Sequence, residues 1–595
     1  MMPHILTPEK RLSVPTSLQY DRKISRGIDV TVLSELDVLI GQVLITGFEG
    51  LEPDADFEGH YLRCPSGGFI LFGRNARSAT QVKALTDKLR EVARTHNPAC
   101  PVPLIGVDQE GGSLSPLRGI VPSLPGNMGL AATGDPEAAR YAGYVTGCGL
   151  LSLGISMNFA PVLDLAREPL NPAVGTRSFG DDPDRVAIFG REYARGLAEA
   201  GVLFTVKHFP GHGSSPDDSH VSMPECPMSV EDLARQDLFP FVEAVKWPSA
   251  AVMVTHVKFT AIDETRPASL SRDVIAGLLR GKMGFDGVVL TDCLEMGGIR
   301  PSGSVPEAAV MAIEAGCDMV LVSHTRALQE AAFAAISDAV RCGRLSVSRM
   351  EQSVARISRW KQGRWARASG GSSPEFGTCW TGELLGERVV TYVPGGAAPR
   401  STSEQSRERS FSESSEHSPA PAPVSGCGPI VLVTPDMGRI TLAEDATDIS
   451  LLKHELERHG IHCAMVRCSM TPDAGDIDHV ISQMTEASGD RGLRKSRPGE
   501  PCARVALVVR NGGTASAQAA QAALAAAIES KADELGWVFA LVGVRDPRET
   551  RALQEALTRR APTFFTYSTE PIVLSALSRA LAGEAGPRGV MPVRM

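Results

Sequence analysis

The sequence predicts an α/β protein with a (β/α)8 TIM-type barrel, then a linker, then a second α/β domain that is doubly wound and flavodoxin-like. Short apolar runs alternate with longer helical stretches up to about residue 325. The composition then shifts to Ser, Gly, Pro and Ala, and the alternation resumes near residue 428. At 595 residues and 43% hydrophobic content, the chain has room for more than one buried core.

Eight apolar runs define the predicted barrel. Segments with helical periodicity separate them, which is typical of parallel strands joined by crossover helices. The runs cover residues 38–47, 67–72, 103–107, 155–163, 202–206, 250–255, 287–290 and 319–322.

Polar side chains follow these runs at the points where the strands should end. In a (β/α)8 barrel the active site lies beyond the carboxyl ends of the strands, so we expect these side chains to converge. In chain order they are Asp108, Asp164, Lys207, His208, His256, Asp292 and His324.

Composition divides the chain into four predicted segments. The low-complexity linker is too poor in apolar residues to order itself. The last segment alternates five apolar runs with helical stretches, and no GxGxxG motif follows its first run, so little supports a nucleotide site. The segments are an N-terminal polar arm (1–35), the catalytic barrel (36–365), the linker (366–427) and the C-terminal α/β domain (428–595).

Charge and hydropathy narrow the classes of partner. The net charge is −9 without a concentrated basic face, which argues against nucleic acid. No run of eighteen apolar residues exists and residues 1–26 lack an apolar block, so we expect a cytoplasmic protein with no membrane partner. The twelve cysteines form no CxxC pair, so no metal is expected on that ground. The sequence does not indicate an oligomeric state.

The segment 207–220 concentrates a cation, imidazoles and carboxylates directly after the fifth run. Its glycines and prolines suit a loop that moves over a bound substrate and carries Asp218 and His220 with it. On these residues alone, a surface turn is an equal alternative. A zinc site is disfavoured because Pro210 and the glycines after it forbid the continuous helix of an HExxH-type site.

Four segments, taken together and in this order, closely resemble the β-N-acetylhexosaminidase branch of glycoside hydrolase family 3. The resemblance covers residues 38–325, and the second domain is similar to the companion domain of two-domain members. It implies a retaining glycosidase that removes terminal, non-reducing β-linked N-acetylglucosamine from a carbohydrate or glycoconjugate, without a cofactor. The segments are GVDQEGG (106–112), NFAPVLD (158–164) with GTRSFG (175–180), the loop 207–220, and LTDCLEM (290–296).

The resemblance also implies roles for individual residues. Asp292 matches the nucleophile that forms a covalent glycosyl-enzyme; the alternative is an N-cap of a helix over 293–298. His220 with Asp218 matches the acid/base pair, because an imidazole titrates near neutrality and a carboxylate can orient it. His212 and His208 are the competing candidates for the acid/base.

Four residues match the sugar-binding positions of the family: Asp108, Arg177, Lys207 and His208. A carboxylate and a planar guanidinium suit the vicinal hydroxyls of a pyranose, and Lys207 and His208 are expected to donate to sugar hydroxyls. The structural alternatives are a barrel-end turn for Asp108 and, for Arg177, a salt bridge with Asp164, Asp181 or Asp182.

One position departs from the family pattern. Pro116 stands at or near the place where an arginine usually follows DQEGG, and Arg118 comes two residues later. Proline cannot donate a hydrogen bond. Either Arg118 reaches in from a shifted loop, or this subsite recognises a different hydroxyl pattern.

Three alternative functions stay open. A phosphorylase would use the same site and pass the glycosyl group to phosphate. The glucosidase or xylosidase branch takes its acid/base from the second domain, and the intact GHG…DSH loop argues against it. A catalytically inactive sugar-binding or regulatory protein would have no need to retain Asp292, Asp218 and His220 together.

Overall fold

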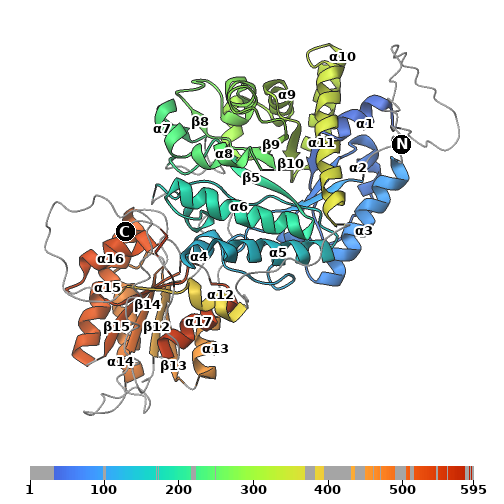
Figure 1. Ribbon diagram of the computed structural model, residues 1–595. Helices are drawn as coiled ribbons and strands as arrows, with labels where there is room; N and C mark the ends of the chain where they lie inside the picture. The colour runs from blue at the N-terminus through green and yellow to red at the C-terminus, as the bar shows by residue number, and fades with distance from the viewer. Residues whose placement is uncertain are drawn as a thin grey trace, which may run out of the picture.

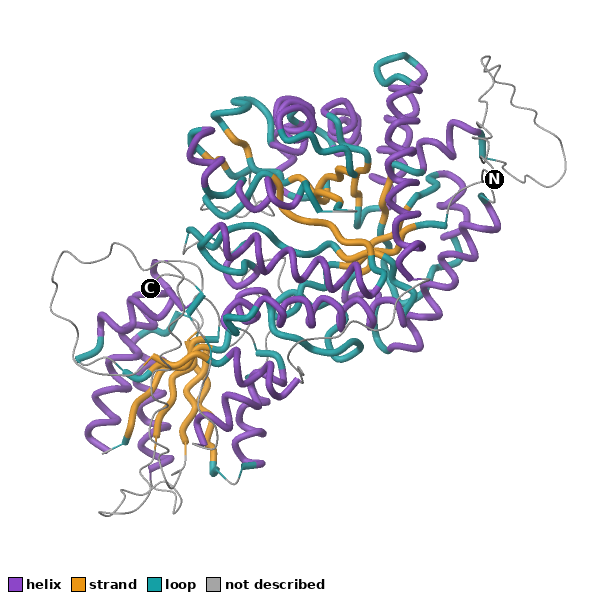
Figure 2. The backbone as a smooth tube through the Cα atoms, in the orientation of Figure 1, coloured by secondary structure: helices purple, strands orange, loops and turns teal. Residues whose placement is uncertain are grey.

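The computed structural model describes two α/β bodies that lie side by side (Figures 1 and 2). The described residues are 33–97, 102–168, 171, 173–215, 223–247, 250–368, 382–393, 430–435, 449–459, 461–469, 471–488, 504–509, 515–535, 537–544, 547–558, 561–567, 569–582, 589 and 591–592.

Eight parallel strands close into a barrel in the first body, in the order β1-β10-β9-β7-β5-β4-β3-β2. Each strand overlaps one of the predicted apolar runs, so the predicted barrel is confirmed. The strands are β1 (Leu44–Thr46), β2 (Gly68–Leu71), β3 (Leu104–Val107), β4 (Met157–Asn158), β5 (Leu203–Phe209), β7 (Ala251–Val254), β9 (Val288–Cys293) and β10 (Met319–Val322).

Two details differ from the predicted runs. Residues 38–41, expected to begin the first strand, belong to helix α1 (Glu35–Gly41), because Leu36 and Ile40 bury one helical face and Ser34 and Asp37 form a capping box. Strands β5 and β9 also extend further than expected. Lys207, His208 and Asp292 are therefore among the last residues of these strands and do not follow them.

Helices cover the outside of the barrel, and a two-stranded sheet of β6 (Glu225–Cys226) and β8 (Lys258–Phe259) lies in its loops. Helices α5 and α6 each begin with an Asp N-cap followed by Pro, the arrangement that favours a helix start. The helices are α2 (Phe57–Arg63), α3 (Ala79–His96), α4 (Asn127–Ala132), α5 (Pro136–Ser152), α6 (Pro183–Ala200), α7 (Val230–Arg235), α8 (Phe239–Ala244), the π-helix η4 (Asp273–Lys282), α9 (Val305–Ala315), α10 (Arg326–Arg341) and α11 (Val347–Ala368).

Helices α5 and α6 pack at close range through glycines. A Cβ atom at Gly143 would lie 2.2 Å from the carbonyl oxygen of Tyr193, and one at Gly196 would lie 2.1 Å from that of Arg140. Any larger residue would therefore push the two helices apart. This contact fixes the helices that lead into and out of β4.

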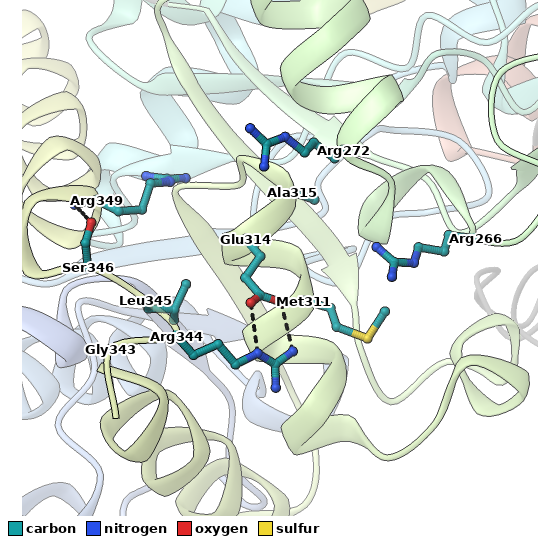
Figure 3. Close-up of a pocket in the computed structure, with 10 residues that line it drawn as sticks. All are labelled: Arg266, Arg272, Met311, Glu314, Ala315, Gly343, Arg344, Leu345, Ser346 and Arg349. Atoms are coloured by element: carbon teal, nitrogen blue, oxygen red, sulfur yellow. Dashed lines mark hydrogen bonds and ion pairs between the residues drawn. The ribbon is translucent and has the colours of Figure 1, made fainter. Parts of the chain in front are cut away.

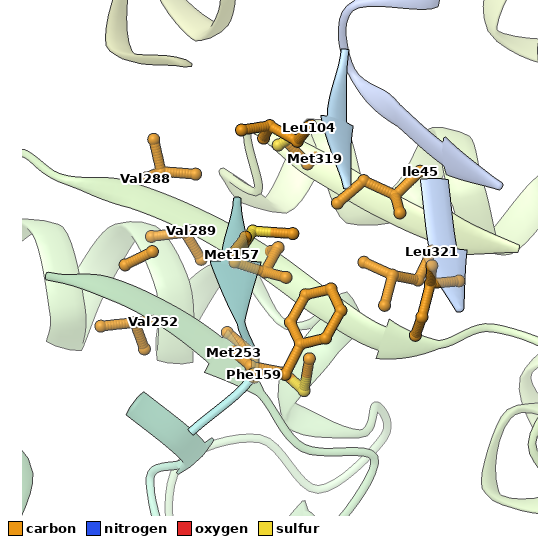
Figure 4. Packing of buried hydrophobic residues seen from close by; sticks show 14 of the residues in the cluster. Ile45, Leu104, Met157, Phe159, Val252, Met253, Val288, Val289, Met319 and Leu321 are labelled. Atoms are coloured by element: carbon orange, nitrogen blue, oxygen red, sulfur yellow. The ribbon is translucent and has the colours of Figure 1, made fainter. Parts of the chain in front are cut away.

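The barrel interior is filled by apolar side chains from neighbouring strands (Figure 4). Met157, Phe159 and Met253 are each at most 2% exposed. Gly106 on β3 makes room for two of them, since a Cβ there would lie 2.6 Å from Met157 and 2.9 Å from Phe159. The glycine that begins the GVDQEGG segment is therefore a packing requirement of the barrel, two residues before Asp108.

The second body is a six-stranded sheet with the order β11-β16-β15-β14-β12-β13. Its five parallel strands follow the order 2-1-3-4-5, which is that of flavodoxin, so the expected fold is confirmed. Helices lie on both faces of the sheet (Figure 2). The strands are β11 (Thr391–Val393), β12 (Ile430–Pro435), β13 (Cys463–Cys468), β14 (Arg504–Val509), β15 (Val538–Gly543) and β16 (Thr563–Phe565); the helices are α12 (Gly382–Val389), α13 (Ser450–Arg458), α14 (Ala474–Ser488), α15 (Ala515–Leu535), α16 (Arg551–Ala556) and α17 (Pro571–Ala582).

Part of the segment assigned to the linker has regular structure. Residues 382–389 form α12, and 391–393 form β11, which pairs antiparallel with β16 at the sheet edge. Leu385, Val389 and Val390 are at most 1% exposed, so this short stretch buries apolar surface that the average composition of 366–427 conceals.

Helix α4 lies on the side of the barrel that is next to the second body (Figure 1). Met128 and Ala132 of α4 belong to the same buried cluster as Val389 and Tyr567 of the second body. Among the described residues, no helix combines the length and apolar character needed to cross a bilayer.

Candidate active site

The loop after β3 is held in place by an amide pair. Asn158 on β4 accepts the backbone N–H of Gln109 at 2.9 Å and donates to its carbonyl at 2.9 Å, while the Gln109 side chain accepts the N–H of Leu117. Gly111 and Gly112 follow with φ of +88° and +58°, a conformation that favours glycine. The backbone therefore fixes where Asp108 and Glu110 stand on either side of Gln109.

Glu110 is the centre of the charge cluster. Its side chain is 2% exposed and accepts two hydrogen bonds of 2.9 Å from the Arg177 guanidinium and an ion pair of 2.6 Å from Lys207 Nζ. Burial would raise its pKa, but the two cations outweigh burial and hold the pKa at about 2. Glu110 is thus ionised, and the ion-pair partner of Arg177 is this residue instead of the three aspartates considered from sequence.

Lys207 bridges Glu110 to Asp108, whose Oδ1 lies 2.5 Å from Nζ. The Lys207 side chain is 2% exposed and that of Asp108 is 21% exposed. Burial raises the pKa of Asp108, although Lys207 opposes the change; the two carboxylates raise the pKa of Lys207 against its burial. Asp108 is therefore the member of the cluster that faces the open side, where a ligand can reach it.

His208 is held by Asp164, with 2.6 Å between Nδ1 and Oδ2. Burial, then the charges of Arg177 and Lys207, lower the pKa of His208 well below its usual value, so the imidazole is neutral near pH 7. The bond to Asp164 places the single proton on Nδ1. Nε2, which lies 3.4 Å from Arg177 Nη2, is then an acceptor, so the expectation that His208 donates to a sugar hydroxyl does not fit this tautomer.

Asp292 lies near the end of β9 and is half-buried. Its Oδ1 accepts the N–H of Cys293 at 2.7 Å. The charge of Asp292 acts on both Asp108 and His208: it adds to the raised pKa of Asp108, which burial mainly causes, and it opposes the lowering of the pKa of His208. The next helical turn begins only at Gly297, so the alternative that Asp292 caps a helix over 293–298 is wrong.

The structure brings five of the seven predicted site residues into one region. Asp108, Lys207, Arg177 and His208 are connected through direct contacts and Glu110, and Asp292 acts on them electrostatically. Asp218 and His220 lie in 216–222, outside the described residues, so their role stays a prediction.

The start of the loop 207–220 is firmly anchored. The His212 N–H donates to Asp164 at 2.8 Å, and Asn171 donates to the carbonyls of His212 and Ser215. Ser214 donates to Asp237 at 2.7 Å, and burial raises the pKa of Asp237 to about 6. Asp164 and Asp237 therefore position the start of this loop, and Glu110 positions Lys207 and Arg177.

Sequence reasoning missed Glu110 and Asp237. Glu110 stands in the quoted GVDQEGG segment, where a second acidic residue beside Asp108 was a usable signal. Asp237 lies in an ordinary amphipathic stretch that carries no signal. His256, considered as a pocket residue, is fully buried and bonded to Ser269 and to the Cys293 carbonyl, so it supports the end of β9.

A separate cavity of about 450 Å³ lies elsewhere on the barrel domain and contains none of the predicted site residues (Figure 3). Arg266, Arg272, Arg344 and Arg349 surround it, and Arg344 is paired with Glu314. Within the described part of the chain, no three His, Cys, Asp or Glu side chains are grouped so as to hold a metal ion.

Comparison with known proteins shows the family of the chain. The family model "Glycosyl hydrolase family 3 N terminal domain" matches residues 36–360. A beta-hexosaminidase of Tolumonas auensis is 38% identical over 288 residues, which are 48% of this chain and 83% of that protein. Beta-hexosaminidase A of Pseudoalteromonas piscicida is 34% identical over 318 residues, 50% of this chain, which spans only 53% of that relative's length.

A solved structure covers both bodies. The glycoside hydrolase family 3 beta-N-acetylglucosaminidase of Paenibacillus sp. str. FPU-7 aligns over 94% of this chain and 99% of its own, with a TM-score of 0.77 and 33% identity. The barrel and the family model together define a glycosidase. The chain belongs to glycosyl hydrolase family 3, and its expected resemblance to the β-N-acetylhexosaminidase branch is confirmed.

Proposed function

We propose that the protein is a retaining glycosidase that removes terminal, non-reducing β-linked N-acetylglucosamine. Asp292 is the nucleophile, and His220 with Asp218 is the acid/base pair. The observation that carries this proposal is the position of Asp292 at the end of β9, beside a cluster whose open side is Asp108. The names of the relatives, beta-hexosaminidase and beta-N-acetylglucosaminidase, support the choice of sugar.

The charge cluster has the properties that a sugar-binding wall needs. Lys207 and Arg177 neutralise Glu110, and Lys207 also contacts Asp108, so the carboxylate of Asp108 is oriented yet retains free acceptor capacity for hydroxyl groups. Because these groups are held by buried contacts, they require little rearrangement when a pyranose binds.

The chemistry proceeds in two displacements. The Asp292 carboxylate attacks the anomeric carbon while His220 protonates the departing oxygen, giving a covalent glycosyl-enzyme. His220 then takes a proton from water, whose oxygen attacks the same carbon and releases Asp292. Each step inverts the anomeric carbon, so the product retains the β configuration.

Release of nitrophenol from an aryl N-acetyl-β-glucosaminide, compared with the corresponding β-glucoside, tests the activity. We expect turnover of the first substrate and free N-acetylglucosamine as the product with or without phosphate. A sugar 1-phosphate that forms only with phosphate would mean a phosphorylase. Tight binding of N-acetylglucosamine without turnover would mean an inactive sugar-binding protein.

The acid/base role has its own test. His220→Ala should lose little activity on substrates whose leaving group departs without protonation, and much more on poor leaving groups. Rates on a series of aryl glycosides of increasing leaving-group pKa measure this. Equal losses across the series would contradict the role of His220.

A further inference from the structure

The second body contacts the barrel at the two loops that carry the sugar-binding cluster. Arg118, in the loop after β3, forms an ion pair of 2.6 Å with Glu570 at the start of α17. Arg548 donates to the carbonyl of Ala166, two residues after Asp164, at 2.6 Å. Gly180, three residues after Arg177, lies against the carbonyl of Pro592, from which a Cβ would be only 2.5 Å away.

The Arg118–Glu570 pair is partly buried and joins the two bodies. The Glu570 side chain is fully buried, and the Arg118 side chain is 32% exposed. A buried carboxylate separated from its cation is strongly unfavourable. The pair therefore favours one placement of the second body against the loop after β3.

Arg118 passes this constraint to the cluster through the backbone. Arg118 Nη1 pairs with Glu570, while Nη2 donates to the carbonyl of Gly112 at 2.6 Å. Gly112 is two residues from Glu110, which holds both Lys207 and Arg177. Because Gly111 and Gly112 have no side chains to anchor the turn, the guanidinium acts as an external support for it.

We propose that the second body positions the sugar-binding loop of the barrel, with Arg118 and Glu570 as the positioning residues. The displaced arginine of the family pattern is thereby explained: at position 118 its guanidinium binds Gly112 and Glu570. The expected effect of this positioning on substrate affinity rests on the proposed function.

Steady-state kinetics of Glu570→Gln, Arg118→Met and the double variant, in the full chain, test the proposal. Loss of positioning affects ground-state and transition-state binding alike, so we expect KM for the aryl N-acetyl-β-glucosaminide to rise roughly 2- to 30-fold with kcat little changed. KM of the double variant should be no higher than that of Arg118→Met, because both changes break the same ion pair between Arg118 and Glu570. The double variant should also regain thermal stability relative to Arg118→Met, which leaves Glu570 buried without its cation, while its KM stays high.

Arg388→Met is the matched control. Arg388 of α12 also approaches a barrel carboxylate across the interface, Asp135 at 3.9 Å, but Asp135 lies at the start of α5 and outside the loops of the cluster. This variant should leave KM unchanged. A rise in KM equal to that of Glu570→Gln would mean general loosening of the interface and would overturn the proposal.

Hydrogen–deuterium exchange of the peptide spanning 108–118 gives a readout that does not depend on turnover. We expect faster exchange in Glu570→Gln and in the double variant than in the wild type and in Arg388→Met. Unchanged exchange and unchanged KM in Glu570→Gln would overturn the proposal, even if Arg118→Met failed to fold. If the wild-type protein did not hydrolyse the substrate, the proposed function would fail, and the exchange comparison would still decide whether the second body positions the loop.

Discussion

Glu110→Gln is the perturbation that most directly probes how the charge cluster is built. The change removes the negative charge of a side chain that is 2% exposed. The positive charges of Arg177 and Lys207 then have one negative charge fewer to balance them. The pKa of Glu110 is lowered from 4.5 to about 2, which corresponds to ~3 kcal/mol of stabilisation at neutral pH. Removing one partner of a buried ion pair typically costs about 3–5 kcal/mol, which is the same range.

The sign of the pH dependence follows from the direction of this shift. Because the folded-state pKa is depressed, the stabilisation is fully present above pH 4.5 and is lost as the pH falls towards 2. The deficit of Glu110→Gln should thus be ~3 kcal/mol at pH 7 and about 1 kcal/mol at pH 3.

Urea unfolding of the full chain, followed by tryptophan fluorescence, measures this difference. Glu307→Gln is the control, because Glu307 is 46% exposed in its pair with Arg344 and should contribute at most about 1 kcal/mol. The reasoning is refuted if Glu110→Gln lies within 1 kcal/mol of the wild type at pH 7, or if its deficit is the same at pH 7 and pH 3.

Two further changes test the surroundings of the site. Burial raises the pKa of Asp237 from 3.8 to about 6, so this carboxyl destabilises the folded protein increasingly as the pH rises from 3.8 through 6. In urea titrations at several pH values, Asp237→Asn should be up to ~3 kcal/mol more stable than the wild type above pH 6, with no advantage below pH 4. Gly196→Ala should cost about 1–3 kcal/mol and lower the Tm in calorimetry, because its Cβ would lie 2.1 Å from the Arg140 carbonyl oxygen. Gly277→Ala is the control, because the nearest atom to its Cβ would be 3.8 Å away. Equal melting temperatures of the two variants would contradict the close packing of α5 and α6.

The barrel and the second sheet could be predicted because apolar runs of strand length alternate with helical stretches, a signal that is local in sequence. The error at 38–41 arose from the same signal, since Leu36 and Ile40 are apolar at helical spacing and continue directly into the first strand. The structured residues 382–393 were missed because a short apolar stretch is diluted within a polar, proline-rich region.

That Asp108, Lys207 and Arg177 lie in one region could be predicted, because residue type and motif coincide at these positions. Their contacts could not be predicted, because the partner of a charged residue is set by the fold. Arg177 pairs with Glu110, 67 positions away, in place of the nearer aspartates. Arg118 pairs with Glu570 in a different body, and no sequence pattern connects two residues at that separation.

Mass spectrometry of the intact protein after reaction with a fluorinated N-acetylglucosamine analogue that accumulates the glycosyl-enzyme is the most direct test of the central claim. We expect the mass to rise by one glycosyl unit, and peptide mapping to locate the added group on Asp292. An adduct on another residue, or no adduct on an enzyme that turns over the aryl glycoside, would contradict covalent catalysis by Asp292.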